Sequence, residues 1–250
     1  MNKLVTVFII SSGIIAINAI AYCYFGLVEE NTNVKFALKC FPAFILAIQS
    51  IGGSIYYRNI SDESHINYCK YLFFAYILCG FGDFVLLLSG KYALISGLSI
   101  FCIVYVLFGS SRINNILAPR LNGYPNCAAF TMSLYILFAL FGLLIALYYI
   151  LDNKSYCNIY FISGVIIYFS AMLYAGSIYL TYYILNRKIG SFFAFAGITL
   201  FMLSDFLIIL HDVKYTIVYI EIAIMLLYWT GITMISWSIY RKEETYIFVY

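Results

Sequence analysis

Long apolar runs separated by short polar connections make up most of this chain. Eight runs approach the ~20 residues that an α-helix needs to cross the hydrocarbon core of a bilayer. They are predicted at about 4–25, 34–57, 70–88, 92–109, 129–151, 158–185, 191–210 and 215–239. The most polar connection is 59–70 and the longest is 110–128. No separable linker interrupts the pattern, so residues 1–250 are predicted to form one all-α transmembrane domain, a bundle of eight helices.

Two of the apolar runs carry a single carboxylate each. Tyr71–Leu88 contains Asp83, and Phe192–Leu210 contains Asp205; an apolar tail follows each aspartate. An ionisable side chain inside a membrane helix costs roughly 3 kcal/mol on insertion scales, so both aspartates are predicted to be functional. The likeness of the third and seventh runs also raises the hypothesis of a parallel 4+4 repeat.

Composition supports an integral membrane protein whose main surroundings are the lipid bilayer. Hydrophobic residues make up 64% of the chain and charged residues 10%, against about 25% charged residues in soluble domains. The net charge of +3 is small and the basic residues lie at helix ends, which gives no case for nucleic-acid binding. The seven cysteines are scattered, as expected for packing residues rather than metal ligands.

The distribution of basic residues predicts the orientation in the membrane. Nine of the 14 lysines and arginines fall on the side that holds both termini, which predicts cytoplasmic termini. In a eukaryote the endoplasmic reticulum is the expected membrane. The nine are Lys3, Arg58, Lys70, Arg112, Arg120, Arg187, Lys188, Arg241 and Lys242.

Four ionisable residues are predicted to share one layer in the outer half of the bundle. Asp83 and Asp205 lie at equal depth because both helices run outward. Lys39 and Glu221 lie near the outer starts of helices that run inward. Such a layer indicates an internal polar cavity.

Three further residues are predicted to bind substrate in this layer. Tyr76 shares a helix face with Asp83, and Ser204 adds a hydroxyl group beside Asp205. Tyr105 lies inside the fourth run, where its ring can line a cavity rather than face lipid.

Four motifs around these residues resemble the lysoplasmalogenase family of integral membrane hydrolases, the YhhN-like proteins. The Gly-Asp and Ser-Asp motifs, in this order along the chain, are the most specific of them. The matching pieces are Lys39-x-x-Pro42, Gly80-x-Gly82-Asp83, Gly97-x-x-x-Phe101-x-x-x-Tyr105 and Gly197-x-x-x-Phe201-x-x-Ser204-Asp205.

The resemblance implies hydrolysis of the vinyl-ether bond of lysoplasmalogens, giving a fatty aldehyde and a glycerophospho-ethanolamine or -choline. This chemistry needs a carboxylic acid that protonates the β-carbon and a carboxylate that stabilises the resulting cation, as in two-carboxylate glycosidases. Asp83 and Asp205 are the predicted acid/base pair, with their individual roles open. Lys39 is expected near the substrate phosphate, and Glu221 is also assigned to substrate binding. No metal or cofactor is expected.

Two alternatives stay open. Carboxylates near the membrane midplane also occur in proton-coupled transporters of small polar or lipid-like solutes. A non-catalytic membrane relative is the other alternative, because the chain departs from the family in two places. The fourth run has no His after Phe101, and the eighth reads Tyr228-Trp229-Thr230-Gly231-Ile232 without the family's Gln.

Overall fold

Nearly all of the described chain is helical. The computed structural model describes residues 3–28, 32–60, 62–88, 91–117, 125–152, 158–213 and 218–239. Eight helices in these ranges are long and apolar enough to cross a membrane, which confirms the predicted fold class. They are α1 (Lys3–Ala21), α2 (Thr32–Asn59), α3 (Glu63–Leu86), α4 (Lys91–Leu117), α5 (Pro125–Asp152), α6 (Ile159–Asn186), α7 (Ile189–Val213) and α8 (Val218–Trp237). The 4+4 repeat stays a hypothesis.

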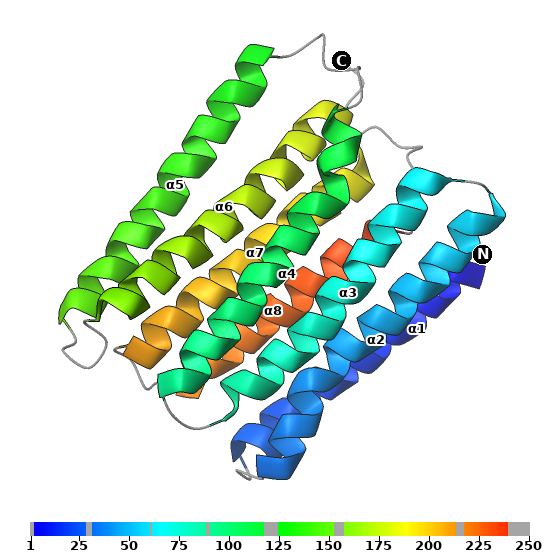
Figure 1. The fold of residues 1–250 in the computed structure, drawn as a ribbon. Helices are drawn as coiled ribbons and strands as arrows, with labels where there is room; N and C mark the ends of the chain where they lie inside the picture. Colours follow the sequence, from blue (N-terminus) through cyan, green and yellow to red (C-terminus); the bar gives the residue numbers. More distant parts are fainter. Residues whose placement is uncertain are drawn as a thin grey trace.

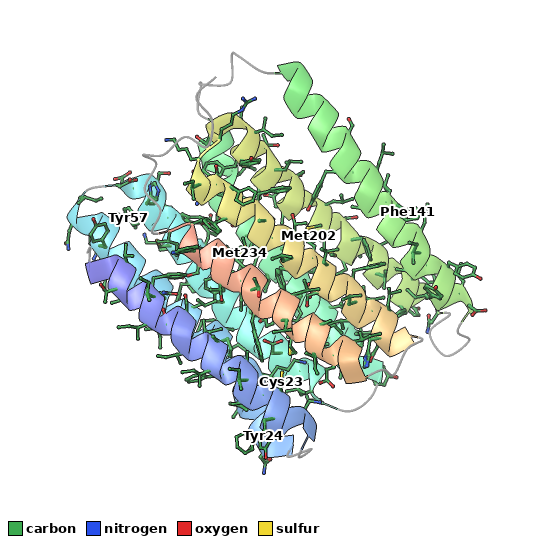
Figure 2. All side chains as sticks on the ribbon, turned by 180° about the vertical axis from the view of Figure 1, so that it is seen from behind. Cys23, Tyr24, Tyr57, Phe141, Met202 and Met234 are labelled. Carbon is green, nitrogen blue, oxygen red and sulfur yellow. The ribbon has the colours of Figure 1, made fainter. Side chains whose placement is uncertain are left out.

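The helices form two layers. Figure 1 shows α2, α3 and α4 in the nearer layer, with α1, α8 and α7 behind them and α5 at one edge. Helix α3 packs between α2 and α4, α4 also packs on α6, and α8 packs mainly on α7. Figure 2, seen from behind, places Tyr57 at one end of the bundle and Cys23 and Tyr24 at the other. We call the second end, where α2 and α8 begin and α3 and α7 end, the cavity end.

The polar connection predicted at 59–70 is mostly helix, which corrects the predicted start of the third run. Helix α3 begins at Glu63 because Asp62 caps it: its carboxylate accepts a hydrogen bond from the backbone N–H of His65 at 3.1 Å. The same carboxylate lies 2.9 Å from Nδ1 of His65. An aspartate at this position satisfies a backbone donor that the first helical turn leaves free.

The fourth run also extends beyond its predicted end, and this changes the environment of Arg112. Helix α4 continues to Leu117, so Arg112 lies within the helix rather than in a connection, and its side chain is only 2% exposed. Its guanidinium lies 3.3 Å from the ring centroid of Tyr68 and 4.4 Å from that of Tyr182. It donates hydrogen bonds to the hydroxyl groups of Tyr182 and Ser238. We call these four residues the arginine cage.

The first run ends differently from the prediction of a single α-helix. After Ala21 the chain continues as a π-helical segment, Tyr22–Val28, which packs on α2. π-Helical turns are rare and often occur at functional sites. This one turns Tyr22 into the bundle, where its hydroxyl donates to Glu221 at 2.9 Å.

Helices α7 and α8 are in backbone contact at two facing glycines, where a larger residue would keep the helices apart. A Cβ atom on Gly197 would lie 2.6 Å from the carbonyl oxygen of Gly231. A Cβ atom on Gly231 would lie 2.8 Å from the carbonyl oxygen of Gly197 and 2.9 Å from the backbone nitrogen of Phe201. Small residues at facing positions allow this backbone contact between membrane helices. The contact fixes α8 against the helix that carries Asp205.

Candidate functional site

Asp83 and Asp205 are both buried and both accept hydrogen bonds from tyrosines. Asp83 is 2% exposed, and its Oδ2 accepts a bond of 2.7 Å from the hydroxyl of Tyr228 on α8. Asp205 is 1% exposed, and its Oδ2 accepts bonds from Tyr105 of α4, at 2.7 Å, and from Tyr168 of α6. Among the described residues, Oδ1 of Asp205 has no hydrogen-bond partner. The two carboxyl groups therefore differ in their surroundings.

Aromatic rings connect the two aspartates. The ring of Phe201 stacks on Tyr105, with centroids 5.0 Å apart, and lies 5.5 Å from the ring of Tyr228. One phenylalanine thus contacts a tyrosine partner of each aspartate. Asp83 also acts electrostatically on Asp205. The structure therefore brings together the two aspartates that the sequence singled out.

Aromatic rings from neighbouring helices pack against the two glycines that precede Asp83. A Cβ atom on Gly80 would lie 2.8 Å from the ring of Phe44, and one on Gly82 would lie 2.8 Å from the ring of Phe101. The space beside Asp83 is thus occupied by rings from α2 and α4. These rings hold α3 between its two neighbours and set the position of the carboxylate.

A cavity of about 500 Å³ opens at the cavity end of the bundle. This volume lies within the ~300–1,000 Å³ range of small-molecule sites. Its described lining combines five titratable side chains with aliphatic ones; the titratable ones are Lys35, Lys39, His211, Asp212 and Glu221.

The aspartates lie one helical turn deeper than this lining. Leu86, Ile208 and Met225 line the cavity, and Asp83, Asp205 and Tyr228 follow on the same helix faces at a spacing of three residues. If a ligand binds with its polar end in the cavity, the part of the ligand next to that polar end would therefore lie closest to the aspartates.

Lys39 lines the cavity and is only 9% exposed. It acts electrostatically on Asp83, one of the two deeper carboxyl groups. In the described part of the chain Lys39 has no hydrogen bond or ion pair. Glu221, by contrast, forms an ion pair of 2.7 Å with Lys35 and accepts the bond from Tyr22.

The remaining predicted site residues lie outside the described lining of the cavity. Ser204 donates to the backbone carbonyl of Ile224 at 3.0 Å and so connects α7 to α8. Tyr76 is fully buried, and its hydroxyl donates to the backbone carbonyl of Ile232 at 3.1 Å. Their predicted role in substrate binding stays a prediction.

Six titratable residues at this site were not among the predicted ones. Two bind the aspartates, one holds Glu221, and three line the cavity; they are Tyr168, Tyr228, Tyr22, Lys35, His211 and Asp212. The cavity residues could have been found from the sequence, because they lie near the ends of predicted runs on the same side of the membrane as Lys39. The tyrosines gave no comparable signal, because the chain has 26 tyrosines.

The arrangement places two unlike, buried carboxyl groups one helical turn deeper than the lining of a charged cavity, in an apolar bundle. Among the described residues, Asp205 accepts from two phenol hydroxyls, whereas Asp83 accepts from one and also has an ammonium group nearby. Such a pair can perform acid/base chemistry on a ligand that enters from the cavity.

Comparison with known proteins identifies the family of the chain. No curated protein and no solved structure matches the chain. A family model, that of the YhhN family, matches residues 34–239 and so covers nearly all of α2 and the whole chain from there to the end of α8. The matched range includes both aspartates and every described residue that lines the cavity. The chain therefore belongs to the YhhN family, the family of lysoplasmalogenase-like membrane proteins.

Proposed function

We propose that this protein is a membrane hydrolase that cleaves the vinyl-ether bond of lysoplasmalogens by acid/base catalysis with Asp83 and Asp205. The observation that carries the proposal is the pair of unlike, buried carboxyl groups one helical turn below a charged cavity. Membership of the YhhN family agrees with a hydrolase of this type.

Asp205 is the proposed acid. Two tyrosine hydroxyls donate to its Oδ2, so that oxygen is an acceptor. Oδ1 has no partner among the described residues and can carry a proton towards a ligand. In the first step the proton moves from Oδ1 to the β-carbon of the vinyl ether, and the former double bond becomes an oxocarbenium ion.

Asp83 is the proposed carboxylate. Of the two aspartates, it is the one on which the ammonium group of Lys39 acts. An ionised Asp83 stabilises the oxocarbenium ion and then takes a proton from the attacking water. The resulting hemiacetal collapses to the aldehyde and the glycerol product, whose oxygen takes up the hemiacetal proton. The proton that Asp83 took from water returns to Asp205, so each turnover consumes one water molecule and restores both aspartates.

The cavity suits the polar end of a lysophospholipid. Lys39 is a cation without an ion pair in the described chain, next to the deep carboxyl groups, and can bind the phosphate. The glycerol backbone would then lie between Lys39 and the aspartates, and the alkenyl chain among the apolar helices. The order of phosphate, vinyl ether and alkenyl chain along the ligand thus matches the order of Lys39, the aspartates and the apolar side chains with increasing depth in the bundle.

The test is aldehyde release by the purified protein from an alkenyl lysophospholipid in heavy water. Protonation of the β-carbon predicts one deuterium on carbon 2 of the aldehyde. Aldehyde added to the same buffer without substrate controls for exchange by enolisation. The saturated alkyl ether with the same head group should not be cleaved, because it has no double bond to protonate. Failure of the well-folded protein to release aldehyde would refute the proposal.

Removing the hydroxyl of Tyr228 should weaken catalysis. Tyr228→Phe keeps the ring against Phe201 but removes the bond to Asp83. A hydrogen bond to a charged group predicts a fall in kcat/KM of about tenfold to a hundredfold. Tyr135→Phe is the matched control, because the hydroxyl of Tyr135 donates to the sulfur of Met202, and it should keep full activity. Equal rates for the two variants would exclude a part for Tyr228 in the reaction.

A further inference from the structure

The charges in the cavity are ordered along its depth. Lys35 and Glu221 neutralise each other through their ion pair. Among the cavity residues that the structure describes, this leaves Lys39 and Asp212 without an ion pair or hydrogen bond. His211 and Lys39 act on Asp212 electrostatically. Lys39 is nearly buried, whereas Asp212 is exposed at the last turn of α7. The free cation therefore lies deeper than the free carboxylate.

This order matches a zwitterionic head group that enters with its chain first. Along such a ligand the phosphate lies nearer the glycerol and the amine lies farther out. A phosphate at Lys39 would place the amine towards the mouth, where Asp212 lies. A head group without an amine would leave the carboxylate of Asp212 without a partner and close to the negative charge of the phosphate.

The lining also distinguishes between kinds of amine. Aromatic residues make up 20% of the chain, yet the described lining of this cavity contains none. Quaternary ammonium groups are typically held by aromatic rings, because they have no N–H to donate. A primary ammonium can donate charge-assisted hydrogen bonds to a carboxylate.

We infer that Asp212 binds the amine of the substrate head group and makes the protein prefer a primary ammonium, as in ethanolamine, to a trimethylammonium, as in choline. This inference rests on the proposed function, because it assigns the mouth of the same site. It makes Asp212 a specificity-determining residue that lies apart from the reacting carboxyl groups.

The test compares kcat/KM for ethanolamine and choline lysoplasmalogens that carry the same alkenyl chain. The parent should favour ethanolamine about tenfold or more, which corresponds to a hydrogen bond with a charged group. Asp212→Asn should lower kcat/KM for the ethanolamine substrate about tenfold and change that for choline less than twofold. Asp152→Asn removes an equal charge from the end of α5, outside the described lining, and should leave the preference unchanged. Equal parent values for the two head groups, or an unchanged preference in Asp212→Asn, would overturn the inference.

A binding measurement separates this inference from the proposed reaction. The saturated alkyl ether with each head group resists acid cleavage, and its affinity can be measured by the shift in thermal unfolding temperature. Tighter binding of the ethanolamine analogue by the parent, lost in Asp212→Asn, supports the head-group assignment even if no aldehyde is released. Equal binding of both analogues, with aldehyde release intact, contradicts the assignment and leaves the hydrolase proposal standing.

Discussion

Replacement of Asp205 by asparagine should lower aldehyde release about a thousandfold, within the range of 10²–10⁴ that general acid catalysis contributes. Asparagine keeps a carbonyl oxygen that can accept the bonds from Tyr105 and Tyr168. Its NH₂ group takes the place of Oδ1, which is free of partners among the described residues. The variant therefore removes the proton donor and preserves the contacts that connect α7 to α4 and α6.

The measurement is kcat for purified protein in detergent, with folding verified by size-exclusion chromatography and thermal unfolding. Asp83→Asn should lower kcat at least about a hundredfold, because a neutral amide cannot stabilise the oxocarbenium ion. Glu63→Gln, an exposed substitution in the first turn of α3, is the matched loss of a carboxylate and should keep full activity. Near-full aldehyde release by either folded aspartate variant would refute the mechanism.

Substitution of Gly231 by alanine should lower the thermal unfolding temperature by about 2–12 °C, because overpacking a tight interface costs typically 1–3 kcal/mol. The new Cβ would lie 2.8 Å from the carbonyl oxygen of Gly197 and 2.9 Å from the nitrogen of Phe201. These atoms belong to the backbone of α7, so the helices must separate to accommodate it. Separation would also shift Phe201 and Tyr228 and should reduce activity together with stability.

Gly52→Ala is the control for the helical propensity of alanine. Gly52 is exposed on α2, and a Cβ atom there would meet nothing within 4 Å. Alanine favours a helix over glycine by up to about 1 kcal/mol, so this variant should unfold at the same or a slightly higher temperature. Equal unfolding temperatures for Gly231→Ala and the parent would show that α7 and α8 do not depend on this contact.

The sequence identified the helices well but placed some of their ends wrongly. Apolar length sets which segments can cross the bilayer, and all eight segments were found. Polar residues next to them were read as connections. The structure shows that Asp62 instead starts α3 and that Arg112 continues α4. Hydropathy cannot separate a polar loop from polar residues that other helices shield.

Only the charged residues of the candidate site could be predicted from the sequence, because burying a charge in a membrane is costly and therefore conspicuous. That cost singled out Lys39, which lines the cavity, and Asp83 and Asp205, which lie one helical turn deeper. Tyr168 and Tyr228 could not be found in this way. Lipid-facing and bundle-facing sides of a membrane helix are both apolar, so periodicity does not show which tyrosines point inward. Pairing a tyrosine with an aspartate also requires the order of helices around the bundle, which hydropathy does not encode.

The arginine cage has a consequence for how the protein is made. Arg112 and Tyr68 belong to helices that leave the ribosome early, whereas Tyr182 belongs to α6 and Ser238 directly follows α8. A guanidinium within a membrane helix is costly unless it has partners. Until α6 has been made, Arg112 has only Tyr68 of these three partners, and the cage is complete only after α8 has been made. A nascent chain that ends before α8 lacks the bond from Arg112 to Ser238.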